Sequence, residues 1–112
     1  MVTKNDWAME ITNTEFQDIV KNGHKLVVVE FFAEWCMPCL MMEPVMEDLA
    51  ASECMKDVKF VKINIDDNPT LANKCKVTSI PCLVIFEEGE EVDRVVGSQT
   101  YDVIEEKIKK FL

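Results

Sequence analysis

The sequence is poor in basic residues and has no long hydrophobic run. Its 112 residues hold 12 Lys and Arg against 21 Asp and Glu, so the formal net charge is −9. A phosphate backbone is bound mainly through clustered Lys and Arg, so this charge argues against nucleic acid or an anionic membrane as a partner. No apolar run approaches the roughly 20 residues that span a bilayer, and residues 1–10 contain no signal-like segment. We therefore expect a cytoplasmic protein with no membrane partner.

Histidine is almost absent as well, because His24 is the only one. A structural zinc site usually needs two closely spaced Cys or His pairs, whereas Cys54, Cys75 and Cys82 are scattered along the chain. We therefore expect no metal site, and we expect no cofactor. The five cysteines are an odd number and cannot all pair within one chain, which disfavours a secreted scaffold held together by disulfides.

What the sequence does contain is a pair of cysteines two residues apart, in the segment Trp35-Cys36-Met37-Pro38-Cys39. Side chains three positions apart are neighbours on a helix, so the sulfurs of Cys36 and Cys39 can reach bonding geometry without unfolding. The pair follows the apolar run Leu26–Phe32 at a predicted strand-to-helix junction. There, the positive end of the helix dipole favours a thiolate on Cys36. These features predict a redox dithiol that makes and breaks a disulfide.

The pattern of apolar residues predicts alternating strands and helices in one domain, residues 1–112. A composition of 48% apolar and 29% charged residues suits a globular domain with a real core. A strand, a helix and a second strand follow one another around the dithiol, so these two strands should be parallel. The expected strands are Asn5–Ile11, Leu26–Phe32, Val58–Ile65, and a hairpin of Cys82–Phe86 with Glu91–Val96. The expected helices are Thr12–Asn22, Cys36–Ser52, Asn68–Cys75 and Tyr101–Phe111.

Several sequence signals predict where these helices begin and end. Thr12 and Glu15 have the spacing of a capping box, in which each side chain satisfies a backbone donor of the first helix. Gly23 is expected to end that helix. Asn68 is expected to cap a later helix that has Pro69 at its first position.

Beyond the dithiol, several segments in the same order resemble the thioredoxin family. They are Phe31-Phe32-Ala33-Glu34-Trp35-Cys36, Pro38-Cys39, Pro44, Lys62-Ile63-Asn64-Ile65-Asp66, Asn68-Pro69, Ile80-Pro81 and Gly97. The similarity runs from about residue 12 to residue 112. It implies a thioredoxin fold of the α/β class, with a central mixed sheet of four to five strands flanked by four helices in three α/β/α layers.

The resemblance also implies an activity. Cys36 would be the exposed nucleophile that attacks a protein disulfide, and Cys39 the buried resolving thiol that releases the reduced substrate. Pro81 would be a cis proline that packs against the dithiol and shapes the groove for the substrate backbone; the alternative is a trans proline that merely starts a strand. The implied protein is a monomeric protein-disulfide reductase in electron transport and cell redox homeostasis. It acts on disulfide-containing proteins and is re-reduced by a thioredoxin reductase.

Glu30 is a lone carboxylate inside the apolar run, so we expect it to be partly desolvated and to have a raised pKa. A neutral acid near Cys39 can exchange a proton with the dithiol. The family usually has Asp at this position, so the proton-relay role that the resemblance implies falls here to a longer side chain. The alternative is an ion pair between Glu30 and Lys62 on the neighbouring strand, and both can hold.

The residues around the cysteines predict an apolar surface for partners. Met37 stands where the family most often has Gly, and Leu40 stands where a Lys commonly follows the second Cys. Flexible thioethers adapt to varied partners. Trp35 suits a core position as well as the surface, and we expect Met42 and Met46 to fill the core. The predicted partner surface consists of Trp35, Met37, Pro38, Leu40, Ile80 and Gly97.

The other cysteines have weaker claims to a role. Cys82 stands where a Thr commonly follows the cis proline, which would place a third sulfur near the dithiol. A buried and inert Cys82 is the stronger interpretation, because Cys is among the residues most often fully buried. We expect Cys54 and Cys75 to be non-catalytic too, with surface oxidation or dimer formation as the alternative for Cys75.

Two other functions use the same residues differently. A disulfide oxidase or isomerase would hold the Cys36 and Cys39 pair at a higher potential, but Pro38 and the lack of a signal segment favour the reducing branch. A redox-silent module would use the fold only for docking. The retention of both cysteines argues against that module.

Overall fold

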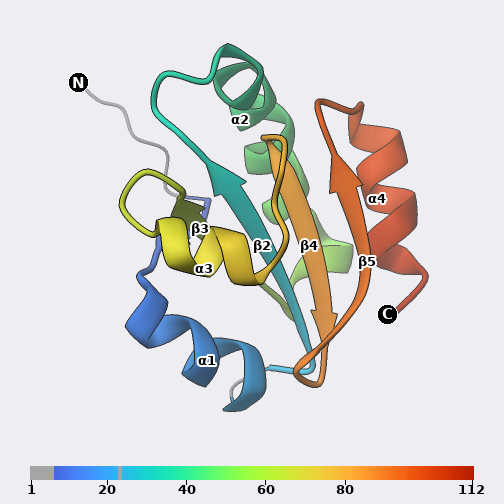
Figure 1. The fold of residues 1–112 in the computed structure, drawn as a ribbon. Coiled ribbons are helices and arrows are strands. Elements are labelled where there is room, and N and C mark those ends of the chain that lie inside the picture. The colour runs from blue at the N-terminus through green and yellow to red at the C-terminus, as the bar shows by residue number, and fades with distance from the viewer. Residues whose placement is uncertain (1–6, 23) are drawn as a thin grey trace.

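The described part of the chain, residues 7–22 and 24–112 of the computed structural model, is built around a five-stranded mixed sheet (Figure 1). The strands are β1 (Met9–Glu10), β2 (Leu26–Phe32), β3 (Val58–Asn64), β4 (Cys82–Glu87) and β5 (Glu90–Val96). Their spatial order is β1-β3-β2-β4-β5, so β2 lies at the centre. β1 and β2 both pair in parallel with β3, whereas β4 is antiparallel to β2 and β5 is antiparallel to β4.

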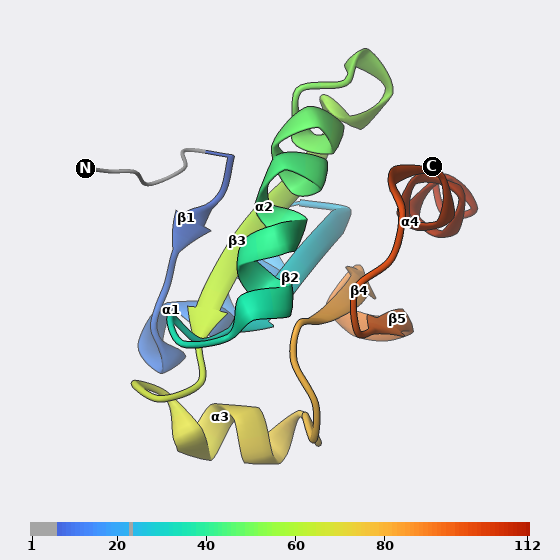
Figure 2. The ribbon, with the colours of Figure 1, turned by 90° about the horizontal axis from the view of Figure 1, so that it is seen from above.

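Helices cover both faces of the sheet, which confirms the predicted three layers. The four α-helices of the described residues are α1 (Asn13–Asn22), α2 (Met37–Ala50), α3 (Pro69–Lys74) and α4 (Tyr101–Lys109), and a short 3-10 helix, η1 (Glu53–Met55), follows α2. Figure 2 shows α2 and α4 on one face and α3 on the other. Phe16 of α1 and Leu71 of α3 share one buried cluster, whereas Met46 of α2 and Ile104 of α4 share a second. None of these helices is long and apolar enough to cross a membrane.

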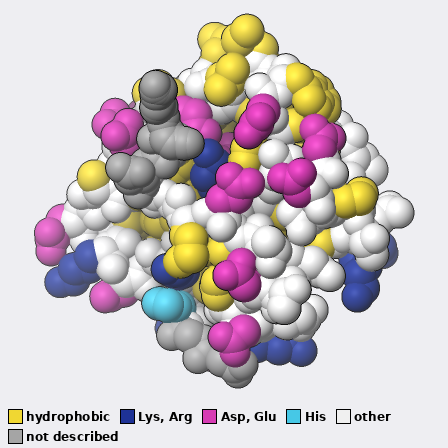
Figure 3. All heavy atoms as spheres, turned by 90° about the vertical axis from the view of Figure 1, so that its left-hand side faces the viewer, with side chains coloured by type: hydrophobic (Ala, Val, Ile, Leu, Met, Phe, Trp, Pro, Cys, Tyr) yellow, Lys and Arg dark blue, Asp and Glu magenta, His cyan; other side chains and the backbone are white. Residues whose placement is uncertain are grey.

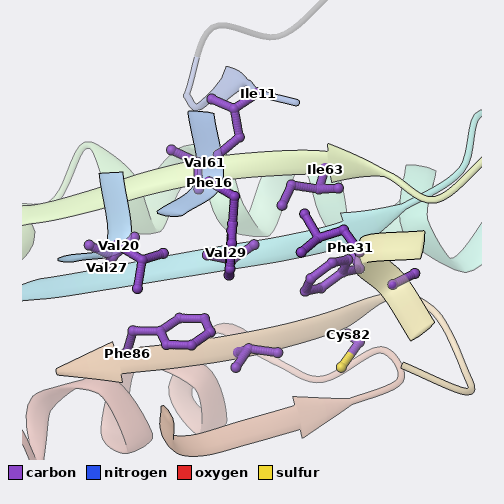
Figure 4. Packing of buried hydrophobic residues seen from close by; sticks show 13 residues of the cluster. Ile11, Phe16, Val20, Val27, Val29, Phe31, Val61, Ile63, Cys82 and Phe86 are labelled. Carbon is purple, nitrogen blue, oxygen red and sulfur yellow. The ribbon is translucent and has the colours of Figure 1, made fainter. Parts of the chain in front are cut away.

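β2 is buried over its whole length, as its apolar run predicts. Alternate side chains of a strand point to opposite faces. The odd-numbered residues from Val27 to Phe31 join the cluster beneath α1 and α3 (Figure 4), whereas Leu26 and Val28 pack in the cluster beneath α2 and α4. Each buried apolar side chain contributes about 1.5–3 kcal/mol. Glu30 is even-numbered, so the one carboxylate of this strand points toward the helix that carries the dithiol.

The helix ends follow the predicted signals with one difference. The backbone N–H of Thr12 donates to Oε1 of Glu15 at 2.9 Å, which confirms the Glu15 half of the capping box. The Thr12 hydroxyl also donates to Oε1 of Glu15, and the backbone N–H of Glu15 bonds the carbonyl of Thr12. Gly23 lies outside the described residues. Asn68 does precede α3, but its side chain makes no capping bond there. Its Oδ1 instead accepts from the backbone N–H of Asn13 at 3.1 Å, so Asn68 caps the start of α1.

The strand boundaries also differ from the prediction in places. The first strand is confirmed only as Met9–Glu10, because just two residues pair with β3; residues 5 and 6 lie outside the described part. The turn between β4 and β5 needs positive φ angles, 51° at Glu88 and 90° at Gly89. Glycine adopts such angles without a steric penalty. The hairpin is therefore confirmed, with one bulge at Ile85/Phe86 that the sequence did not reveal.

Candidate active site

The dithiol lies where β2 ends and α2 begins. Cys36 is the N-cap of α2, with φ −86° and ψ 104°, and a proline in the first turn supports the helix start. Cys36 and Cys39 are joined by a disulfide, with their Cα atoms 5.2 Å apart. The backbone N–H of Cys39 donates to Sγ of Cys36 at 3.2 Å. The first turn of α2 therefore holds both sulfurs together and directs a helix donor at the first of them.

Both cysteines are buried in this disulfide form. Cys36 is 4% exposed and Cys39 is 2% exposed, and both pack with Phe32, Ala33 and Ile80. The expectation of an exposed Cys36 beside a buried Cys39 is thus wrong for the oxidised protein. Phe32 at the end of β2 and Ala33 belong to the same buried cluster as the two cysteines.

An exposed apolar rim surrounds the buried dithiol. Trp35 is 69% exposed and its Nε1 donates to Oδ2 of Asp66 at 2.8 Å, so Trp35 belongs to the surface rather than to the core. Met37, Leu40 and Met41 are 62%, 51% and 70% exposed. Figure 3 shows hydrophobic side chains gathered at the end of the molecule where α2 begins. The predicted apolar surface is therefore present beside the dithiol.

Two methionines of the same helix face inward instead. Met42 and Met46 are 2% and 0% exposed and pack in the cluster beneath α2 and α4. The prediction that they fill the core is confirmed. The backbone N–H of Gln99 lies 3.4 Å from the sulfur of Met42, so this side chain also fixes the loop before α4.

Two loops bring the remaining predicted residues to the dithiol. The Ile80–Pro81 peptide bond is cis, and Ile80 packs against the cluster that contains the disulfide. The backbone N–H of Gly97 donates to the carbonyl of Pro81 at 2.8 Å, and Gly97 has φ 86°. The hydroxyl of Ser98 donates to the carbonyl of Pro38 at 3.3 Å. The predicted cis proline and the glycine after β5 thus converge on the start of α2.

Glu30 is the most perturbed acid of the site. It is 1% exposed, and neither carboxylate oxygen has a hydrogen-bond partner among the described residues. Burial, aided by the negative charge of Glu43 and opposed by Lys62, raises the pKa of Glu30 to about 8. A buried carboxylate without a partner is costly, so the neutral acid is the favoured form at neutral pH. The expected raised pKa is confirmed.

The ion pair between Lys62 and Glu30, the alternative offered by the sequence, is not formed. The two residues stand opposite each other in the parallel register of β2 and β3, but Nζ of Lys62 lies 2.9 Å from Oε2 of Glu43 on α2. The long lysine side chain reaches past the sheet surface to the helix above it. The direct ion pair between Glu30 and Lys62 is therefore wrong, although the lysine charge still lowers the pKa of Glu30.

Sequence reasoning missed Glu43 and Trp7. Nε1 of Trp7 donates to Oε1 of Glu43 at 2.5 Å, and Nζ of Lys62 lies 5.4 Å from the centre of the Trp7 ring. A signal was available for Glu43, because residues four apart lie on one face of a helix and Glu43 follows Cys39 by four. No periodic pattern pointed to Trp7, which reaches the site from the segment before β1.

The other cysteines do not belong to the buried cluster that contains the disulfide. Cys82 is 1% exposed and belongs to the cluster beneath α1 and α3, not to that of the dithiol. Nη1 of Arg94 lies 3.9 Å from Sγ of Cys82, and Nη2 donates to the carbonyl of Cys75 at 2.8 Å. Burial raises the pKa of both the Cys75 and the Cys82 thiols. This environment fits the interpretation of Cys82 as a buried thiol, while Cys54 is exposed.

The described residues contain no group of three or more His, Cys, Asp or Glu side chains that could hold a metal ion. What the site presents is one disulfide at a helix start, a buried neutral acid and an apolar rim. A disulfide within a Cys-x-x-Cys turn can open and close by exchange with a second thiol pair. On an α/β/α sheet, these parts define a thiol–disulfide oxidoreductase.

Comparison with known proteins gives the family. The thioredoxin family model matches residues 8–110. A thioredoxin of Porphyra purpurea is 42% identical over 103 residues, 92% of this chain and 95% of the relative, and one of Staphylococcus saprophyticus is 41% identical over 104 residues, 93% and 97%. The solved structure of a mutant thioredoxin from Halobacterium salinarum has a TM-score of 0.84 at 35% identity, and the match covers 98% of this chain and 96% of that one.

The chain belongs to the thioredoxin family. It is a protein-disulfide reductase that carries electrons as a dithiol on Cys36 and Cys39. Disulfide-containing substrates and a reductase partner follow in general terms from that membership.

Proposed function

We propose that this protein reduces disulfides of other proteins in a reducing compartment and is itself recharged by a thioredoxin reductase. The observation that carries the proposal is the closed Cys36–Cys39 disulfide at the start of α2, with a helix N–H aimed at Sγ of Cys36. The chain would pass two electrons at a time from the reductase to a substrate, a role in electron transport and cell redox homeostasis.

The reaction runs in two exchanges. Cys36 as thiolate attacks one sulfur of the substrate disulfide, forming a mixed disulfide and releasing the other substrate sulfur as a thiolate that takes up a proton. Cys39 then loses its proton and attacks Sγ of Cys36, which breaks the mixed disulfide and frees the second substrate thiol. The substrate gains two electrons and two protons, and the chain is left as the disulfide that the structure contains.

Glu30 is proposed as the proton relay of the second exchange. Its carboxyl lies in the even-numbered series of β2 that faces α2, two residues before Phe32, which packs against both cysteines. With a pKa of about 8, Glu30 can give up or accept a proton near neutral pH. Lys62 acts on Glu30 through its charge rather than through a direct bond.

The substrate is proposed to lie across the apolar rim. Ile80, Pro81 and Gly97 would form the groove that receives its backbone, because the cis peptide and the Gly97 N–H bond lie beside the start of α2. The exposed side chains beside that groove would contact substrate side chains. They are Trp35, Met37, Pro38 and Leu40.

A reducing compartment such as the cytoplasm is proposed from the remaining cysteines. Cys54, Cys75 and Cys82 are all free thiols, and Cys54 is exposed. Free thiols persist where glutathione and reductases keep them reduced. We further propose that the chain acts as one domain and as a monomer, since the rim, the groove and the dithiol all come from one sheet and its helices.

The test is reduction of insulin with dithiothreitol as the electron donor. The native protein is expected to accelerate precipitation of the insulin B chain, and Cys36→Ser is expected to be inactive. An inactive native protein would instead favour a docking module without redox turnover. Recharging by a purified thioredoxin reductase and NADPH tests the partner separately, because dithiothreitol bypasses it.

A further inference from the structure

Lys62 stands opposite the buried acid Glu30 on the neighbouring strand, but it forms its ion pair with Glu43 instead. Glu30 on β2 and Lys62 on β3 are register partners in the parallel ladder. The ammonium of Lys62 nevertheless lies 2.9 Å from Oε2 of Glu43 on α2, and both side chains are largely buried, 10% and 19% exposed. The two oxygens of Glu30 have no hydrogen-bond partner in the described part of the chain.

The position of Lys62 is held from three sides. Its Nζ lies 4.5 Å from the centre of the Phe32 ring and 5.4 Å from that of Trp7, both within cation–π range. The carboxylate of Glu43 is fixed in turn by the indole N–H of Trp7. The lysine is therefore seated between two rings and one carboxylate, on the helix side of the sheet.

We propose that Glu43 is a positioning residue for the dithiol chemistry: it anchors Lys62 to α2 and so withholds the ammonium from the carboxyl of Glu30. This inference rests on the proposed relay role of Glu30. In the proposal Glu43 acts through Lys62 and through its own charge rather than by contact with a substrate.

The charges around Glu30 support this assignment. On β4 its register partner is Leu83, which is uncharged, and the residues of α4 that pack in the same core are Ile104 and Ile108. The charged groups that act on Glu30 are Glu43, which raises its pKa, and Lys62, which lowers it. Removing the Glu43 charge therefore acts twice in the same direction, by deleting a repulsion and by releasing the lysine.

The test is a direct titration of the Glu30 carboxyl, by carbon NMR or by its infrared C=O band, in the oxidised full-length protein. Glu43→Gln keeps an acceptor for Trp7 but loses the charge, and we expect the midpoint to fall by about one pH unit or more, as an opposite charge nearby lowers a carboxyl pKa by 1–3 units. Glu47→Gln, which removes an exposed acid one turn later on α2, is the matched control and should leave the midpoint in place.

A double variant tests whether Lys62 causes the fall of the Glu30 midpoint. Adding Lys62→Met to Glu43→Gln is expected to move the midpoint back upward, because the released ammonium is then absent. If Glu43→Gln leaves the midpoint unchanged, or if Lys62→Met does not reverse the fall, the positioning role is wrong. If Glu43→Gln does not fold, Glu43→Asp replaces it, with a smaller fall expected from the shortened anchor and an unchanged midpoint again overturning the role.

Two separate readouts distinguish a failure of the proton-relay role of Glu30 from a failure of the positioning role of Glu43. The carboxyl titration needs no turnover. It can therefore show that Glu43 controls the pKa of Glu30 even where neither residue affects the rate of disulfide exchange. The pH profile of insulin reduction by Glu43→Gln supplies the second readout. It should shift to lower pH together with the titration midpoint only if Glu30 also exchanges protons with the dithiol.

Discussion

The backbone N–H of Cys39 donates to Sγ of Cys36 at 3.2 Å, so the N-cap sulfur accepts a hydrogen bond from the first turn of its own helix. Hydrogen bonds to an ionised acceptor are roughly twice as strong as neutral ones. The same donor, together with the helix dipole, therefore stabilises negative charge on Cys36 once the disulfide opens. This hydrogen bond supports our proposal that Cys36, rather than Cys39, is the sulfur that attacks a substrate.

This asymmetry predicts different fates for the two serine variants. Cys39→Ser should still attack a substrate disulfide but cannot resolve the product, so it should accumulate a mixed disulfide with substrate. Cys36→Ser should accumulate none. Non-reducing electrophoresis and mass spectrometry check this, and equal trapping by both variants would remove the assignment of Cys36 as nucleophile.

Loss of the buried acid should slow exchange. Glu30→Gln keeps the shape of the side chain but cannot give up a proton, so we expect reduction of insulin to slow by roughly a hundredfold, the lower end of general acid–base effects. The pH dependence near the pKa of about 8 should flatten as well. Rates that match the native protein across about pH 6 to 9 would rule out the relay.

The same acid makes folding depend on pH with a definite sign. The folded pKa of Glu30, about 8, lies above its ordinary value of 4.5. The folded state therefore holds a proton that the unfolded state has lost between these values, and stability falls as pH rises through that window. The loss is at most about 1.4 kcal/mol per pH unit.

Urea unfolding of the oxidised protein at several pH values between about 5 and 8 measures this slope. Glu30→Gln should unfold with a flatter pH dependence than the native protein. Glu47→Gln, an exposed acid on α2, should keep the native slope. Identical slopes in the native protein and in Glu30→Gln would show that Glu30 is ionised when folded.

The apolar rim should govern affinity for protein substrates. Met37 and Leu40 are 62% and 51% exposed beside the dithiol, and burial of such side chains against a partner is favourable in proportion to the area covered. We expect Met37→Gly and Leu40→Lys to raise KM for protein disulfides several-fold while the rate with a small aromatic disulfide stays the same. Val103→Ala, an exposed position on α4, serves as the control. Unchanged KM and an unchanged dithiol potential in Met37→Gly would exclude a rim role for that residue.

The free thiols should react in the order of their exposure. Cys54 is exposed, Cys75 is half-buried and Cys82 is buried, and burial raises the pKa of the latter two. Because the thiolate is the reactive form, iodoacetamide at neutral pH should label Cys54 first and Cys82 last in the oxidised native protein. Mass spectrometry follows the order, and rapid labelling of Cys82 would contradict its buried placement. Mild oxidation should yield only the Cys36–Cys39 bond.

The fold was largely predictable because its main signals are local. β2 is a nearly continuous apolar run, the dithiol marks a helix start, and Glu15 caps the backbone N–H of Thr12 as the spacing suggests. Asn68 was assigned to the right place but to the wrong helix. Its side chain bonds Asn13, a residue 55 positions earlier, and no local pattern reports such a contact.

Most members of the site were predictable, but Glu43, Trp7 and the pairings between side chains were not. A carboxylate inside an apolar strand is expected to be desolvated, so the raised pKa of Glu30 could be predicted from the sequence. The partner of Lys62 did not follow, because strand neighbours suggest Glu30 while the helix above supplies Glu43. The burial of Cys36 was missed for a related reason, since it depends on packing around the closed disulfide.

The reduction potential of the Cys36–Cys39 pair, measured against glutathione, tests the central claim most directly. A protein-disulfide reductase needs a stable disulfide and a strongly reducing dithiol, so we predict a value near the known thioredoxin potential of about −270 mV. A value near about −120 mV, that of a strong disulfide oxidant, would show that the dithiol is the favoured form and that the chain oxidises rather than reduces its partners.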